Sequence, residues 1–272
     1  MGLSAAASSA VRRVDSTCRV LGAGSGGNSW SGVYFADFTA LEGGDVFQFG
    51  VFQGGTLSLL SRIYAGYQIF GFDSFEGLPP EEDENFQVNK WHVGRFKTPI
   101  ERVRQRVPNA TLIAGFYNES LTPTLVSEYG MRPAAYVDID TDLYISSKQA
   151  LSWMYEQGLL VPGTIIGYDD WWTLACAAND TAVEAHGEAR AHQQLARKYG
   201  ARFRCVCGPC IPIPRGHAFG GRTYFALEKF GAADADAGFH MSHADCAHWM
   251  RTAKFCGLVR MSHRAIGSRD GK

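Results

Sequence analysis

The sequence predicts an α/β protein in which parallel strands form an open sheet and helices cover both faces. Short runs rich in β-branched and aromatic residues alternate with segments of helical periodicity, and the connections between them are short. Two of the predicted strands end directly in acids, near residues 140 and 169. Because ligands of open α/β sheets bind beyond the carboxyl ends of the strands, this pattern also predicts where the functional site lies.

The composition is that of a globular chain. The 272 residues are 46% hydrophobic and 19% charged, enough to bury one large core. A net charge of −1 gives no general attraction to nucleic acid or to anionic membranes, so we expect neither as a partner. No apolar run approaches the roughly 20 residues that span a bilayer. The 7 scattered cysteines favour free thiols and a cytoplasmic location.

The sequence from Met1 to Lys272 divides into three predicted parts. Residues 1–40 form an N-terminal extension whose Ala, Ser and Arg content is shared with organelle-targeting segments, although we favour a plain extension. Residues 41–232 form the main domain. Residues 233–272 form a weakly patterned tail, expected to pack on the same domain, with a helix near 244–255.

The first predicted strand begins at Val46 and breaks into a glycine-rich turn that opens a helix over 57–64. The turn leaves the amides at the helix N-terminus free. Gly50 and Gly54 also allow close approach of the backbone, which suits the carboxylate or phosphate of a small cofactor.

A second strand over 68–72 ends in Asp73, about 20 residues after the glycine turn, where nucleoside-binding α/β proteins hold ribose hydroxyls. A helix or turn cap is the alternative role for Asp73. Residues 81–94 lack a clear period and are typical of an active-site loop. After a helix over 98–107, the strand over 111–116 ends at Phe116 and Tyr117, either of which could stack on a planar base.

The two acidic strands carry the main chemical prediction. An interior strand over 134–139 precedes Asp140 and Asp142, a helix covers 146–157, and a strand over 164–168 precedes Asp169 and Asp170. If these strands are parallel neighbours, the four carboxylates meet in one crevice and repel one another. A divalent cation would relieve that repulsion, and ligands that are all oxygen favour magnesium, manganese or calcium over zinc. A helix over 181–199 and strands over 201–207 and 222–229 complete the domain.

Two other enzyme classes use an Asp-x-Asp motif after an apolar strand. Metal-dependent glycosyltransferases hold the diphosphate of a sugar nucleotide with it. Phosphohydrolases with an aspartate nucleophile usually place Thr or Val two residues after the second Asp, where this chain has Tyr144. Neither class accounts for the glycine turn together with Asp73.

Four segments, 49–56, 71–79, 140–144 and 169–171, together resemble the macrocin O-methyltransferase family and occur in the family's order. The resemblance implies a Rossmann-like class I methyltransferase with a mostly parallel, seven-stranded sheet whose last strand is antiparallel. It also implies an enzyme that depends on S-adenosyl-L-methionine and Mg²⁺ and methylates a hydroxyl of a small molecule, such as a sugar or natural product. A methyltransferase fold kept as a non-catalytic binding module is an alternative, and a homo-oligomer is compatible with either.

The resemblance also assigns roles to residues. It implies that Asp142 is the general base. The implied metal ligands are Asp140, Asp169 and Asp170. The implied cofactor-binding residues are Gln48, Gly50, Val51, Gly54, Thr56, Asp73, Ser74, Phe116 and Asp140. At Gln48 the chain departs from the family, which usually has an acid there to pair with the ammonium group of the cofactor.

Overall fold

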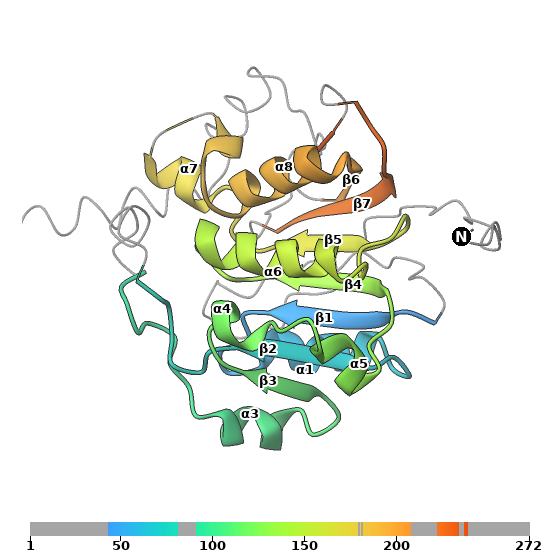
Figure 1. The fold of residues 1–272 in the computed structure, drawn as a ribbon. Helices are drawn as coiled ribbons and strands as arrows, with labels where there is room; N and C mark the ends of the chain where they lie inside the picture. The colour runs from blue at the N-terminus through green and yellow to red at the C-terminus, as the bar shows by residue number, and fades with distance from the viewer. Residues whose placement is uncertain are drawn as a thin grey trace, which may run out of the picture.

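A single open sheet of seven strands organises the computed structural model, which describes residues 43–80, 91–178, 180, 182–207, 222–233 and 237–238 (Figure 1). The strand order is β3-β2-β1-β4-β5-β7-β6. The strands are β1 (Asp45–Phe49), β2 (Ile69–Asp73), β3 (Thr111–Ala114), β4 (Ala134–Ile139), β5 (Ile165–Tyr168), β6 (Arg202–Cys207) and β7 (Thr223–Lys229). The helices are α1 (Gly55–Ile63), α3 (Ile100–Arg106), α4 (Tyr117–Ser120), α5 (Leu125–Tyr129), α6 (Tyr144–Glu156), α7 (Thr173–Ala178), the 3-10 helix η1 (Val183–Ala185) and α8 (Gly187–Tyr199).

Most of the sheet is parallel, as predicted, but its last strand is not. β1 pairs in parallel with β2 and β4, β2 with β3, and β4 with β5. β7 runs antiparallel to both β5 and β6, which the reversed arrow in Figure 1 makes visible. The all-parallel prediction drawn from the strand and helix pattern is therefore wrong at this edge. An antiparallel strand needs no helical crossover, and the proline-rich segment before β7 has no helical pattern. The mixed sheet that the family resemblance implies is confirmed.

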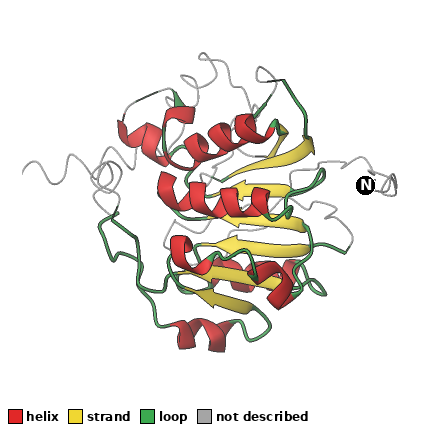
Figure 2. Cartoon of the chain, in the orientation of Figure 1, coloured by secondary structure: helices red, strands yellow, loops and turns green. Residues whose placement is uncertain are grey.

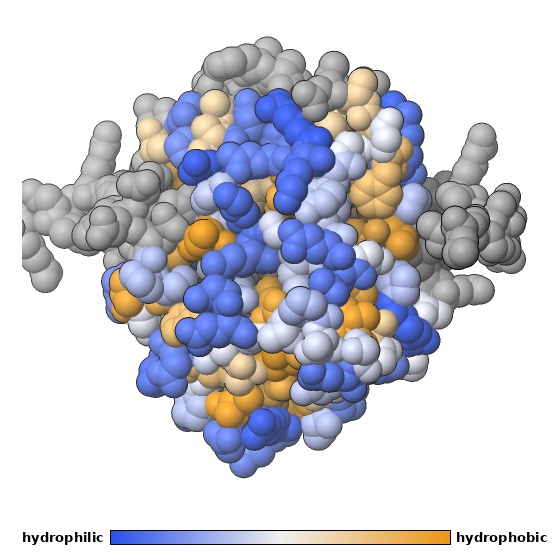
Figure 3. All heavy atoms as spheres, viewed as in Figure 1, coloured by the Kyte–Doolittle hydropathy of each residue, from blue (hydrophilic) through white to orange (hydrophobic). Residues whose placement is uncertain are grey.

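Alternate residues of the strands feed two separate cores. Phe47 and Val137 pack under α6 and α8, whereas Val46 and Tyr136 pack with α1 and α3 on the opposite face. Figure 1 and Figure 2 show α6 and α8 in front of the sheet and α1 partly hidden behind it. This two-sided burial explains why the strands are nearly continuous apolar runs. In Figure 3 hydrophilic residues gather over α8, whose outer face carries the exposed Arg197 and Lys198.

Most predicted elements are confirmed, and one helix start is wrong. The helix predicted over 181–199 begins at Gly187, after the 3-10 helix η1. Gly187 has a positive φ of 46°, which interrupts a continuous helix at that point. The helices α4 and α5, of 4 and 5 residues, are too short to show a period in the sequence and were not predicted.

Some predictions fall on residues that the structure does not describe. The extension over 1–40, the helix near 244–255 and most of the loop over 81–94 are among them. The sequence favoured free thiols over a disulfide framework, whereas the structure records a disulfide bond at Cys205. Within the described ranges, no helix has both the length and the apolar character needed to cross a membrane.

A buried histidine makes the stability of the fold sensitive to acid. His192 of α8 is 2% exposed, packs against Phe203 and Phe225, and its Nδ1 lies 2.8 Å from the hydroxyl of Tyr168. Burial lowers the pKa of His192 to about 3. Because the pKa of His192 is lower in the folded protein, the neutral imidazole contributes fully to stability above the unfolded pKa of about 6.5. This contribution is lost as the pH falls toward 3.

At pH 5 His192 is protonated in the unfolded chain but not in the folded protein. We therefore expect His192 to lower the free energy of unfolding by about 2 kcal/mol at this pH. His192→Gln keeps a hydrogen-bonding group for Tyr168 but does not titrate. Urea unfolding at pH 7 and pH 5 should show a smaller pH-dependent loss in this variant than in the wild type. Equal losses in the two proteins would contradict this assignment.

Candidate active site

The predicted site residues lie along one edge of the sheet, at the carboxyl ends of five adjacent strands. In strand order these residues are Phe116 after β3, Asp73 at the end of β2, Gly50 after β1, Asp140 after β4, and Asp169 after β5. The cofactor residues proposed from the resemblance thus occupy the β3-β2-β1 side, and the acids occupy the β4-β5 side. Asp140 is at the boundary of the two groups.

The glycine turn after β1 packs directly against the loop after β4. Gly50 has a φ of +84°, and a Cβ atom placed on it would lie 1.8 Å from the backbone oxygen of Asp140. No other residue type fits this position without moving the acid-bearing loop. Gly54 is the N-cap of α1 in a left-handed conformation, followed by Thr56 in the first turn. The predicted cofactor turn and the predicted metal loop are therefore in contact.

Asp73 uses one carboxylate oxygen to hold the glycine turn and the other to cap the loop that follows it. Oδ2 accepts the amides of Val51 at 2.7 Å and Phe52 at 2.9 Å, and Oδ1 accepts the amide of Phe75 at 2.7 Å. A carboxylate offers about four acceptor positions, so about one remains for a ligand hydroxyl. The turn-capping alternative for Asp73 is thus present in the structure. Ser74 is also engaged locally, since its hydroxyl donates to the Gly77 carbonyl at 2.9 Å.

The two aromatic residues after β3 differ in their surroundings. Tyr117 turns into the core, where its hydroxyl donates to the Phe72 carbonyl at 3.2 Å and its ring meets Phe49 edge-on. Phe116, which is partly buried like Tyr117, lies beside the end of β2, because the amide of Gly115 donates to the Asp73 carbonyl. Of the two candidates for stacking on a base, Phe116 is the better placed.

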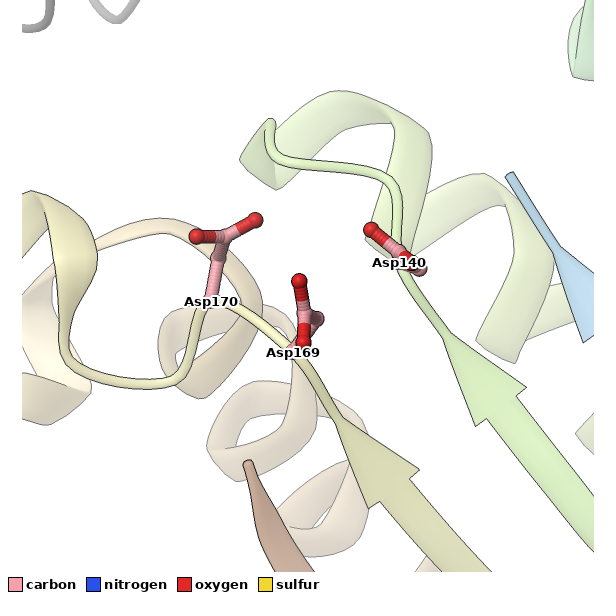
Figure 4. A group of neighbouring side chains, drawn as sticks. All are labelled: Asp140, Asp169 and Asp170. Carbon is pink, nitrogen blue, oxygen red and sulfur yellow. The ribbon is translucent and has the colours of Figure 1, made fainter. Parts of the chain in front are cut away.

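Three carboxylates converge beyond the ends of β4 and β5 (Figure 4). Asp140, Asp169 and Asp170 each offer an oxygen, and these oxygens lie within 4.8 Å of one another. Asp140 comes from the β4 end, and the adjacent pair comes from the β5 end. The sequence prediction that neighbouring parallel strands bring these acids together is therefore borne out in geometry.

An arginine that the sequence did not point to lies within this cluster. Arg222, just before β7, has a side chain that is 4% exposed. Its Nη1 pairs with the fully buried Asp138, Nη2 donates to Asp140 at 3.0 Å, and Nε lies 2.8 Å from Asp169. All three nitrogens of the guanidinium are thus engaged by acids from two strands. The arginine fixes one face of the cluster and leaves the other oxygens of Asp140 and Asp169 for further partners.

Asp142 lies beside the cluster in an unusual backbone conformation. It is 9% exposed, has a φ of +62°, and forms a side-chain hydrogen bond with Asp170. Burial, and then the charges of Asp170 and Asp140, raise the pKa of Asp142 well above its usual value. Burial and the charge of Asp169 raise the pKa of Asp170 to about 7.

A model of the macrocin O-methyltransferase (TylF) family matches residues 40–197, more than half of the chain. The chain belongs to the macrocin O-methyltransferase family. It is therefore an O-methyltransferase, with the Rossmann-like fold that binds the methyl donor in such enzymes. This assignment replaces the glycosyltransferase and phosphohydrolase alternatives.

Solved structures with a similar fold include three methyltransferases. The calicheamicin methyltransferase CalS11 is 21% identical, with a TM-score of 0.47 over 67% of this chain and 72% of that one. The O-methyltransferase NovP is 18% identical, with a TM-score of 0.48 over 68% and 72%. The SAH-bound PaMTH1 of Podospora anserina is 11% identical, with a TM-score of 0.41 over 68% and 72%. No curated protein matches the sequence.

The residues present fit the cofactor that a macrocin O-methyltransferase family member is expected to use. Gln48 is 1% exposed, and its Nε2 donates to the Gly50 carbonyl at 2.8 Å. Its buried Oε1 has no hydrogen-bond partner within the described part of the chain. A buried acceptor without a donor costs free energy. The position of Gln48 before the glycine turn suits an ammonium donor, so the departure from the family's acid keeps an acceptor there.

The acid cluster likewise fits a divalent cation. Asp138, Asp140, Asp142, Asp169, Asp170 and Glu188 lie together, and the ion pairs that the described part of the chain gives them are those of Arg222. One guanidinium offsets only part of this negative charge. Burial, and then the charge of Asp169, raise the pKa of Asp140 well above its usual value. A cation with oxygen preference would relieve the remaining repulsion.

Sequence analysis did not identify Arg222, Asp138 or Glu188 as site residues. Asp138 had a signal, because it shares the period-2 face of β4 with Asp140. Glu188 had one as well, since it lies four residues before His192 on the buried face of α8. Arg222 had none, since a single arginine before an apolar strand is usually solvated.

Proposed function

We propose that the protein transfers the methyl group of S-adenosylmethionine to a hydroxyl of a sugar or related natural product, with Mg²⁺ held by Asp140, Asp169 and Asp170. One observation supports the proposal above the others. The glycine turn that would bind the methionine part of the donor touches the loop that carries Asp140, through the contact at Gly50. A donor methyl and a metal-held hydroxyl can therefore be placed side by side.

On the cofactor side, each strand end would bind a different part of the methyl donor. Gln48 Oε1 would accept the ammonium group, and the backbone of Gly50, Val51 and Gly54, with Thr56 at the start of α1, would surround the carboxylate end. The remaining acceptor position of Asp73, beside Ser74, would take one ribose hydroxyl, and Phe116 would cover the base. This assignment follows the order of the strands across the sheet.

The acid side supplies the proton acceptor and the orientation of the acceptor hydroxyl. When bound, the donor supplies an electrophilic methyl group, and the metal ion lowers the pKa of a ligated hydroxyl. Asp142, beside Asp170, would accept the hydroxyl proton as general base. Holding the oxygen and the methyl in line contributes about 7–11 kcal/mol, more than the proton transfer itself.

The experiment that tests this function is a product analysis. The purified protein is incubated with S-adenosylmethionine, Mg²⁺ and a panel of hydroxylated glycosides and macrolides, and products are analysed by mass spectrometry. We expect one acceptor to gain the mass of a methylene group, with S-adenosylhomocysteine released in equal amount. A protein that binds the donor but methylates no member of a broad panel would favour a non-catalytic binding module.

A further inference from the structure

Glu188 links the two loops that carry the acid cluster. It lies in the first turn of α8 and is 0% exposed. Its Oε1 accepts the backbone amide of Thr141 at 3.2 Å, and its Oε2 accepts the backbone amide of Asp170 at 3.0 Å. Thr141 stands between Asp140 and Asp142 after β4, whereas Asp170 follows β5. A single carboxylate therefore spans the ends of two strands.

Around Thr141, the loop after β4 also makes hydrogen bonds of its own. The amide of Leu143 turns back to the Thr141 carbonyl at 2.6 Å, and the Thr141 hydroxyl lies 2.8 Å from that of Ser147. Asp142 is held at a positive φ, a conformation that costs free energy unless its neighbours fix it. The amide of Thr141 has Glu188 as its acceptor. Breaking that bond would release the turn that aims both acids.

The helix that carries Glu188 is itself held firmly. A Cβ atom on Gly187 would lie 2.8 Å from Leu174, and Ala189 and Ala191 are fully buried. The start of a helix also favours a carboxylate. Because both oxygens of Glu188 accept hydrogen bonds from backbone amides, they are directed to the two loops and not to the converging oxygens of Asp140, Asp169 and Asp170.

We propose that Glu188 is a positioning residue that sets the separation between the carboxylates after β4 and those after β5, and with it the geometry of the cation site. The inference rests on the proposed function for the identity of the cation. Its structural part, that one carboxylate connects the two loops, rests only on the hydrogen bonds that Glu188 accepts from the backbone amides of Thr141 and Asp170.

Glu188→Gln tests this proposal, because glutamine has one acceptor oxygen and its NH₂ group faces an amide that also donates. One loop amide is then unpaired. We expect the variant to fold, to bind S-adenosylmethionine as the wild type does, and to bind Mn²⁺ with a dissociation constant 10- to 100-fold higher, on the order of what loss of an orienting partner costs. Hydrogen exchange should also accelerate at the amides of Thr141 and Asp170. Glu184→Gln, at an exposed position in the preceding 3-10 helix η1, is the control and should change neither quantity.

Glu188→Asp separates reach from charge, since it keeps the charge but is one methylene shorter. We expect it to fail as Glu188→Gln does, and wild-type Mn²⁺ affinity in Glu188→Asp would overturn the proposal. Unchanged Mn²⁺ affinity in a folded Glu188→Gln, or loss of donor binding as well, would also overturn it. If the wild type binds no Mn²⁺, the metal-dependent function fails instead. The link between the loops is then judged by hydrogen exchange, and unchanged exchange in Glu188→Gln would refute it.

Discussion

Replacing Arg222 by Met should destabilise the protein by about 3–5 kcal/mol, the loss typical when one partner of a buried ion pair is removed. Asp138 is fully buried and would lose its cationic partner, leaving only the hydroxyl of Tyr136 as a donor to Oδ1. Its Oδ2 already has no hydrogen-bond partner among the residues that the structure describes. Asp140 and Asp169 would also lose the arginine, but they are partly exposed, so water can solvate them. The measurement is the free energy of unfolding in urea without added metal.

A second variant separates the loss of charge pairing from the loss of packing. Arg222→Met combined with Asp138→Asn removes the buried unpaired charge, and we expect it to recover a large part of the stability. Arg104→Met is the surface control, because Arg104 and its partner Glu101 are both mostly exposed. If Arg222→Met costs no more than Arg104→Met, the arginine is not the internal counter-ion of the cluster.

Replacing Asp142 by Asn should lower kcat by 10²- to 10⁴-fold, the usual contribution of a general base, with little change in KM. Asparagine is the informative substitution for a structural reason. The backbone of Asp142 has a φ of +62°, and asparagine tolerates this left-handed conformation better than alanine does. Its amide can also keep a hydrogen bond to Asp170. The variant therefore removes the base with little change in shape.

Donor binding by calorimetry and Mn²⁺ binding are the controls for Asp142→Asn, and both should match the wild type. The rate is measured with the acceptor found by product analysis. A variant that turns over at the wild-type rate would move the base role to another residue. A variant that loses Mn²⁺ would instead place Asp142 among the metal ligands.

The strands and the position of the site were predictable because they depend on local patterns. The apolar run of β4 was predicted with the bounds that the structure has, 134–139. The prediction that Asp140 meets Asp169 and Asp170 needed only two adjacent parallel strands, which the short connection through α6 favours. The antiparallel β7 did not follow from strand and helix patterns, because direction within a sheet is a tertiary property.

The partners of the acids were less predictable, because they come from distant parts of the chain. Arg222 reaches Asp138 across 84 residues, and Glu188 reaches Thr141 across 47. Contacts between residues so far apart in the sequence produce no periodic pattern around the acids from which they could be predicted. Asp73 illustrates a different limit. Its place at the end of β2 suggested ribose binding, but Oδ2 already accepts two amides of the glycine turn and Oδ1 accepts the amide of Phe75. A sequence cannot show how many acceptor positions a carboxylate has left.

The central claim is that the ends of β4 and β5 hold one divalent cation next to the methyl-donor site. The most direct test is a titration of Mn²⁺, followed by electron paramagnetic resonance, into the wild type and into a variant with Asp169→Asn and Asp170→Asn, each with S-adenosylmethionine present. The account predicts one Mn²⁺ site per chain in the wild type, displaced by excess Mg²⁺, and no such site in the variant although it still binds the donor. A wild type that binds no Mn²⁺, or a variant that binds it equally well, would contradict the account.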